Sequence, residues 1–132
     1  MKTLRVGIAS YGEMKARSLA IARGEHRPGP GEPKVWFPSL ESFAKVLSDS
    51  NRALLRMITE DTPGSIAELA ERSGRARSNL SRTLHTMERY GLVRLEKGAR
   101  GRVVPHVPYS EILLDVPIKA FNQKDRDARV SA

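Results

Sequence analysis

The chain has 132 residues, 39% of them hydrophobic, so it is long enough for one domain with a modest core and too apolar to be disordered throughout. Its 23 Lys and Arg against 15 Asp and Glu give a net charge of +8, which favours a polyanionic partner: nucleic acid, an anionic membrane surface or an acidic protein. The absence of cysteine excludes disulfides and thiolate metal ligands, and no apolar run suits a signal peptide or a membrane span, so we expect a soluble cytoplasmic protein.

The positive charge is concentrated in one part of the chain. Residues 62–110 carry nine basic and four acidic side chains, and residues 75–102 alone carry eight against two. Residues 35–61, in contrast, have one more acidic than basic side chain, and residues 111–132 are balanced. The sequence therefore predicts a basic patch rather than a generally basic surface.

The first 48 residues are expected to form an extension of β and α elements. Leu4, Val6 and Ile8 follow the period-two pattern of a half-buried strand. A helix is expected over residues 11–23, with one face formed by Tyr11, Met14, Ser18, Ile21 and Ala22.

The rest of this extension begins with a loop. Three prolines and three glycines in "GEHRPGPGEP" predict that residues 24–33 form no regular structure. "KVWF" predicts a short strand, and Ser39 is the expected N-cap of a helix over residues 40–48. Apolar residues at core spacing in that helix are Leu40, Phe43, Ala44 and Leu47.

Three helices are expected over the next 40 residues or so. The first spans residues 51–60 and buries Leu54, Leu55 and Ile58. Ser65 and Glu68 have the spacing of a capping box. They open a second helix, which buries Ile66, Leu69 and Ala70 and ends at Gly74.

The third helix is expected from about residue 77 to residue 90, with Leu80, Leu84 and Met87 as its buried stripe. Two strands, "LVRLE" and "RVVPHV", then surround the glycine-containing loop "KGARG", and "EILLDV" forms a further strand. We expect this last strand to pair with the first strand of the chain.

This order of elements predicts an α+β fold, a winged helix-turn-helix with an N-terminal β-α extension. The predicted parts are the extension over residues 1–48, a DNA-binding domain over residues 49–116, and a polar, disordered tail over residues 117–132. The extension is expected to supply the interface of a homodimer or of another protein partner.

The third helix and the following hairpin carry side chains suited to double-stranded DNA. Arg can bind guanine and Asn adenine through two hydrogen bonds, and hydroxyls in a first helical turn can meet phosphates. A hairpin tip with several cations can follow a phosphate backbone or enter a minor groove. No acidic residue occurs from residue 74 to residue 87. The candidate DNA-binding residues are Arg75, Arg77, Ser78, Asn79, Ser81, Arg82, His85, Thr86, Arg89, Lys97, Arg100 and Arg102.

Two resemblances to known families sharpen this prediction. "SIAELAERSGRARSNLSRTLHTMERYGLVRLEKGARGRVV" resembles the winged helix of MarR- and ArsR-like regulators. "LRVGIAS", "GEPKVWFPSLESFAKVLSDSNRALL" and "VPYSEILLDV" resemble small bacterial and archaeal regulators of the TumA antitoxin type. The resemblances imply a sequence-specific repressor that controls its own operon and neutralises a partner toxin.

The resemblance also implies residue roles. It assigns DNA contacts to Arg77, Ser78, Asn79, Ser81, Arg82 and the hairpin cations. Ala76 stands where many relatives have a Ser or Thr N-cap, so we expect the cap to move to Ser78 and the helix to be shorter. Arg75 and Arg77 would then contact phosphates rather than bases.

Other functions fit the sequence less well. His26, His85 and His106 are too scattered for a metal site, and no acid accompanies Ser81 and His85 as a nucleophilic triad requires, so we expect no metal, no cofactor and no enzyme. A protein-interaction module whose basic face docks an acidic partner remains the alternative.

The aromatic content of 5% disfavours single-stranded nucleic acid and RNA as ligands. Trp36, Phe37 and Phe43 have apolar neighbours and are expected in the core. The small residues of the 11–23 helix do not suit membrane binding.

Overall fold

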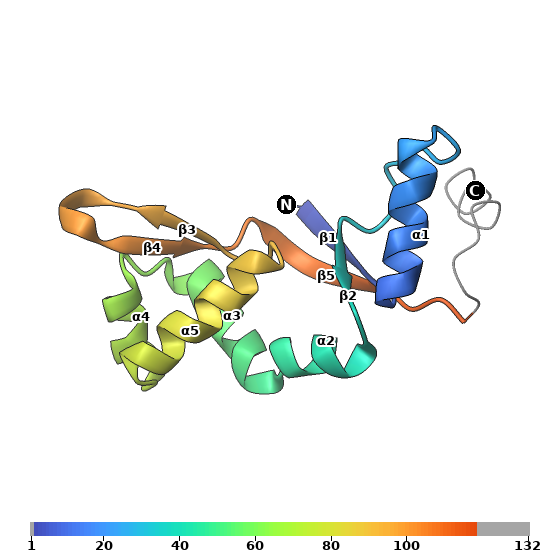
Figure 1. Cartoon of the computed structure of the whole chain (residues 1–132). Coiled ribbons are helices and arrows are strands. Elements are labelled where there is room, and N and C mark those ends of the chain that lie inside the picture. The colour runs from blue at the N-terminus through green and yellow to red at the C-terminus, as the bar shows by residue number, and fades with distance from the viewer. Residues whose placement is uncertain (1, 119–132) are drawn as a thin grey trace. The chain divides into compact units, whose positions relative to one another are not determined.

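The computed structural model describes residues 2–118, which form an α+β fold of five α-helices and two small β-sheets (Figure 1). Two compact units are present. We call residues 44–110 the helical unit, and residues 3–43 together with 111–118 the sheet unit. This division differs from the expected boundaries at residues 48 and 116, because the last strand pairs with the first one and so belongs to the sheet unit.

The sheet unit contains one helix and three strands, of which the last comes from the C-terminal part of the described chain. These elements are β1 (Lys2–Ile8), α1 (Tyr11–Ala22), β2 (Val35–Phe37) and β5 (Tyr109–Asp115). The sheet order is β2-β1-β5, so the expected pairing of the first and last strands is confirmed. β2 runs parallel to β1, with Val6 opposite Val35.

Helix α1 begins with a complete capping box, in which Ser10 and Glu13 bond each other's backbone N–H groups. The residues that we expected on one inward face of this helix are only partly buried. Met14 and Ile21 are half-buried, but Tyr11 is 83% exposed, and Ser18 and Ala22 are also exposed. The half-buried face instead includes Arg17, whose long apolar stem can cover hydrophobic surface.

The loop that follows α1 has no helix or strand, as expected, but it contains two buried polar residues, His26 and Glu32. Glu32 accepts a 2.8 Å hydrogen bond from Arg17, and its Oε1 lies 2.6 Å from His26 Nε2. The Arg17 guanidinium also lies 5.3 Å from the centre of the Trp36 ring. Gly7 of β1 is close to the same ring, since a Cβ at this position would lie 2.6 Å from it.

Helix α2 (Leu40–Val46) is shorter than expected. Ser39 caps it by accepting a hydrogen bond from the backbone N–H of Ser42. The expected inward face is again only partly buried: Leu40 and Ala44 are exposed, whereas Phe43 and Leu47 are half-buried.

The three aromatic residues expected in the core differ in burial. Phe37 is fully buried and packs edge-on against Phe43, with ring centres 5.3 Å apart. Trp36 and Phe43 are half-buried.

The helical unit contains three consecutive helices and an antiparallel hairpin. They are α3 (Asp49–Asp61), α4 (Ile66–Ser73), α5 (Arg77–Arg89), β3 (Arg94–Lys97) and β4 (Val103–His106). α4 packs on α3 and α5, β3 on α5, and β4 on α3 and α4. The hairpin turn includes a short 3-10 segment, Ala99–Gly101.

The core of the helical unit confirms the predicted helical periodicity. Each fully buried leucine contributes about 1.5–3 kcal/mol relative to an exposed one. Of the residues expected inside these helices, only Ile66 is half-buried rather than buried. The buried apolar residues are Leu54, Leu55, Ile58, Leu69, Ala70, Leu80, Leu84, Met87, Leu92 and Val93.

The helix ends follow the caps in the sequence with small shifts. Ser48 caps α3, which therefore begins two residues earlier than expected. Ser65 caps α4 by accepting from the Glu68 N–H, while the Glu68 carboxylate accepts from the N–H of Gly64 rather than from that of Ser65. Gly74 ends α4 in the left-handed conformation, with φ of 74°.

The predicted disordered tail, residues 117–132, lies outside the described residues except for its first two positions. Within residues 2–118, no helix has the length and apolar content needed to cross a membrane.

Candidate nucleic-acid interface

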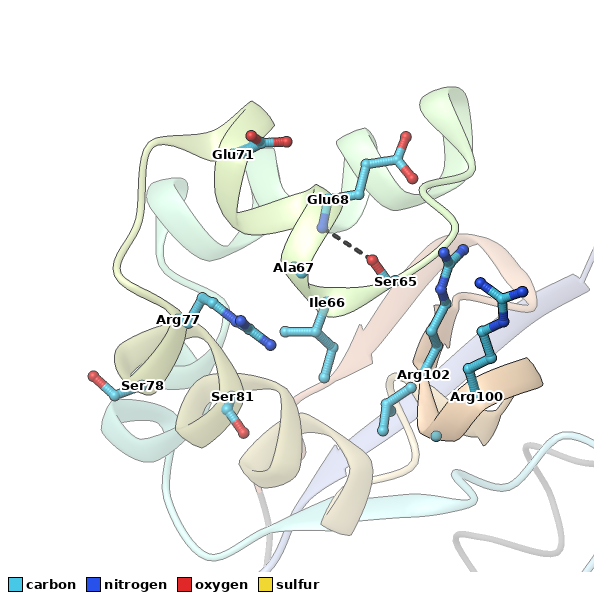
Figure 2. Close-up of a pocket in the computed structure, with 12 residues that line it drawn as sticks. Ser65, Ile66, Ala67, Glu68, Glu71, Arg77, Ser78, Ser81, Arg100 and Arg102 are labelled. Carbon is cyan, nitrogen blue, oxygen red and sulfur yellow. Dashed lines mark hydrogen bonds between the residues drawn. The ribbon is translucent and has the colours of Figure 1, made fainter.

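An open groove of about 1030 Å³ lies between the first turns of α4 and α5 and the turn of the β3–β4 hairpin (Figure 2). Figure 2 shows Arg77 extending from α5 toward Ile66 of α4, which places a guanidinium beside the apolar part of the groove. Three arginines line the groove, one from α5 and two from the hairpin. The lining residues are Ser65, Ile66, Ala67, Glu68, Glu71, Arg77, Ser78, Ser81, Arg100, Gly101, Arg102 and Val103.

Helix α5 begins at Arg77, so the expected shift of its cap to Ser78 is wrong. The N-cap is Ala76, whose carbonyl accepts a 2.9 Å hydrogen bond from the N–H of Leu80 and thereby starts the helix. Ala76 has no side-chain oxygen, and no side chain of the described residues caps this end of α5. The first N–H groups of α5 are therefore open to an anion, and the helix dipole favours negative charge there.

The exposed side of α5 presents Arg82 to solvent. The neighbouring side chains are more engaged: Thr86 donates to the Arg82 carbonyl at 3.1 Å, and Arg89 donates to Thr86 at 3.4 Å. Among the candidates on this face, Arg82, His85 and Arg89 are exposed, while Ser81 and Thr86 are half-buried.

Ser81 and His85 do not form a nucleophile and base. The Ser81 hydroxyl is 3.5 Å from His85 Nδ1, but the same nitrogen lies 2.7 Å from the Ser81 carbonyl oxygen. Because a carbonyl only accepts, this contact requires that Nδ1 carries the proton, and a protonated Nδ1 cannot remove a proton from the hydroxyl.

Arg75 differs from the other candidate cations because it is half-buried and bonded within the molecule. Its guanidinium donates to Asn51 Oδ1 at 3.0 Å, to Asn79 Oδ1 at 3.3 Å and to Thr83 Oγ1 at 3.3 Å. Sequence spacing gave no indication of the contact with Asn51, which is 24 positions away.

The hairpin turn exposes Lys97, Arg100 and Arg102. Arg100 adopts φ of 61° and ψ of 33°, a left-handed conformation that non-glycine residues rarely take. The turn is closed by a 2.7 Å hydrogen bond from the N–H of Gly98 to the carbonyl of Arg102.

The candidate cations of the α4–α5 turn, of α5 and of the hairpin form no direct ion pair with any residue that the structure describes. Within the described residues, Arg72 forms an ion pair with Glu68 at 3.0 Å, and Arg94 forms one with Glu96 at 3.6 Å. Over the same part of the chain, the seven candidate arginines and lysines form no ion pair. These are Arg75, Arg77, Arg82, Arg89, Lys97, Arg100 and Arg102, of which Arg77, Arg100 and Arg102 line the groove.

Two carboxylates stand on the α4 side of the groove, those of Glu68 and Glu71. The hydrogen bond from the Gly64 N–H lowers the pKa of Glu68 and outweighs desolvation, which raises it; the charge and hydrogen bond of Arg72 and the charge of Arg102 lower it further. Glu68 is thus held as a carboxylate. The positive potential of the groove therefore comes from its α5 and hairpin sides.

The groove brings together only part of the predicted set. Arg77, Ser78, Ser81, Arg100 and Arg102 line it, whereas the other predicted residues do not. The contributions of α4 were missed, since they depend on how α4 packs against α5 and not on a local motif. The predicted residues outside the lining are Arg75, Asn79, Arg82, His85, Thr86, Arg89 and Lys97.

The described residues contain no group of three or more His, Cys, Asp and Glu side chains that could hold a metal ion. The arginines and serines that line the groove offer hydrogen-bond donors and positive charge, which suit an anionic ligand.

These features define the helical unit as an α+β domain with three packed helices, an antiparallel hairpin and an arginine-lined groove. The chain belongs to the HVO_A0114 family, whose model matches residues 46–114, slightly more than half of the sequence. The matched segment contains every residue that lines the groove. Comparison with curated proteins and with solved structures gives no match.

Proposed function

We propose that the helical unit is a winged helix-turn-helix that binds double-stranded DNA, with α5 as the recognition helix and the β3–β4 hairpin as the wing. In this proposal the chain is a sequence-specific transcriptional regulator, a repressor that acts in the cytoplasm. One observation carries it: three exposed arginines from two separate elements line one groove, and none of them forms a direct ion pair within the described residues.

The physical argument concerns the free energy of those charges. Exposed arginines in a folded protein often pair with nearby carboxylates, as Arg72 and Arg94 do here. Like charges left unpaired repel one another and destabilise the free protein slightly, and a phosphate backbone removes this repulsion while releasing counterions. The open first turn of α5 adds N–H donors to the same side.

The resemblance to TumA-type antitoxins extends the proposal to a homodimer, to control of the protein's own operon and to a partner toxin. The sheet unit and α2 are not needed for a minimal winged helix, so they are available for these protein contacts. Two DNA-binding units related by a two-fold axis would reach half-sites one helical turn apart.

The alternative is that the same basic face docks an acidic protein. It makes a different prediction about DNA, because a protein-docking face would bind any duplex weakly and through charge alone. Sequence selectivity therefore decides between the two functions.

The experiment is fluorescence anisotropy with the full-length protein, the DNA upstream of its own gene and a scrambled duplex of equal composition, across a salt series. Each phosphate contact should add about −0.9 to the log–log salt slope, and the upstream DNA should bind at least ~10³-fold more tightly than the scrambled one. Equal, weak binding to both duplexes would contradict a sequence-specific regulator and favour the docking alternative.

Arg82→Ala is the informative variant, since Arg82 is exposed on α5 and its loss leaves the helix core intact. We expect about 1–3 kcal/mol of lost binding energy if Arg82 reads a base pair. Arg56→Ala is the matched control, because Arg56 is also an exposed arginine but lies on α3 rather than on the proposed recognition helix. Equal losses in the two variants would mean that net charge alone drives binding.

A further inference from the structure

Arg75 stands in the turn between α4 and α5 and connects two helices of the helical unit. Each of its three guanidinium nitrogens donates to a different side chain: Nη1 to Asn51, Nε to Asn79 and Nη2 to Thr83. Asn79 and Thr83 are four residues apart and so lie on one face of α5, while Asn51 belongs to the first turn of α3.

The acceptor on α3 is itself fixed. The backbone N–H of Asn51 donates to the Ser48 hydroxyl at 3.2 Å, and its Nδ2 donates to the carbonyl of Val46 at 2.9 Å. The amide of Asn51 therefore has one orientation, with Oδ1 directed at Arg75. A single arginine thus ties two successive turns of α5 to a rigid point at the start of α3.

We infer that Arg75 is a positioning residue, which sets the rotation of α5 about its axis and orients the Asn79 amide, rather than a residue that contacts DNA itself. The DNA part of this inference rests on the proposed function. A bidentate contact with guanine or phosphate needs two guanidinium nitrogens directed at the ligand. In Arg75 each of the three nitrogens already donates within the molecule, so the guanidinium plane is held in place and only one N–H on each Nη is left over.

The orientation of Asn79 has a chemical consequence for the same face. Its Oδ1 is directed at Arg75, so its Nδ2 is left for a ligand. Nδ2 only donates, which fits phosphate oxygens and acceptor atoms of bases. It does not fit the paired acceptor and donor of adenine, which an asparagine reads with both of its amide atoms.

Thermal unfolding of the free full-length protein tests the positioning role without DNA. Arg75→Ala and Asn51→Ala should each lower Tm by about 4 °C or more, since each removes a charge-assisted hydrogen bond. The double variant should lose less than the sum of the two single losses, because both changes break the Arg75–Asn51 bond, although each also removes bonds of its own. Arg77→Ala is the control, since Arg77 is an exposed arginine whose side chain makes no hydrogen bond within the described residues, and it should shift Tm by less than about 2 °C.

DNA binding separates positioning from contact. Arg75→Lys keeps the charge but cannot reproduce the three-nitrogen geometry, so it should weaken binding about as much as Arg75→Ala, roughly tenfold, with the salt slope unchanged. Asn79→Asp keeps an acceptor for Arg75 but replaces the Nδ2 donor. It should retain the wild-type Tm and bind DNA at least about tenfold more weakly.

Three results would overturn the inference: additive effects of Arg75→Ala and Asn51→Ala on Tm, wild-type binding by Arg75→Lys, or a salt slope reduced by about 0.9 in Arg75→Ala. Failure of the proposed function is a separate outcome. It would appear as the absence of selective binding by the unaltered protein, and coupled effects on Tm would still support the positioning role.

Discussion

Replacing Arg100 with glycine is expected to make the protein more stable and a weaker DNA binder. The residue adopts φ of 61° and ψ of 33° at the hairpin turn, a conformation that is unfavourable for an L-residue by about 1–2 kcal/mol. Glycine removes this term but loses about 0.5–1 kcal/mol through the greater freedom of the unfolded chain. The net gain is about 0.5–1 kcal/mol, or a rise in Tm of roughly 2–5 °C.

Thermal unfolding followed by circular dichroism measures the first effect, and the anisotropy salt series measures the second. If Arg100 contacts a phosphate, the salt slope should become shallower by about 0.9. Arg102→Gly is the matched control, because Arg102 carries the same charge two residues away at an ordinary φ of −66°. This change should remove the charge without relieving any backbone strain, and it should therefore lower Tm. Equal shifts of Tm in the two variants would refute the argument from backbone conformation.

Three further predictions concern stability. Gly7→Ala should destabilise the sheet unit by about 1–3 kcal/mol, since its Cβ would meet Trp36 at 2.6 Å; urea unfolding checks this, and an unchanged midpoint would mean that the ring shifts freely. Leu84→Ala should lower the free energy of unfolding by about 2–5 kcal/mol, whereas the same change at the exposed Leu113 should have little effect; similar losses at both would argue against the assigned core. The folded-state pKa of Glu68 is below its ordinary value of 4.5, so its stabilising contribution is present above that pH and is lost as the pH falls through the folded pKa. The free energy of unfolding of Glu68→Gln should therefore depend less on acid pH than that of the unaltered protein. An identical pH profile of stability in the two proteins would contradict this.

The sequence predicted the helical unit more accurately than the sheet unit, for a physical reason. In α5 the large residues Leu80, Leu84 and Met87 recur at helical spacing among polar ones, so only one face can be buried. Helix α1 has mostly small residues, and its inward face includes Arg17, which no hydrophobic pattern identifies. Periodicity therefore located the helix and not its packed face.

The candidate site was predictable only in its local parts. The helical spacing of α5 and the glycine-containing loop that follows it were enough to predict where the cations of these two elements lie. Neither the contribution of Ile66 and Glu71 to the groove nor the bond between Arg75 and Asn51 could be predicted, since both depend on how helices far apart in sequence pack together.

The path of the chain bears on the order in which the protein can fold during synthesis. The helical unit is inserted in the sheet unit, and the contact between Thr3 and Glu111 spans 108 positions. Residues 44–108, nearly all of the helical unit, are synthesised before β5, whereas β1 is made first and pairs with its second neighbour only when β5 has been made. Until then one edge of β1 has unpaired backbone N–H and C=O groups, so this strand is the point at which a nascent chain is most open to pairing with another molecule.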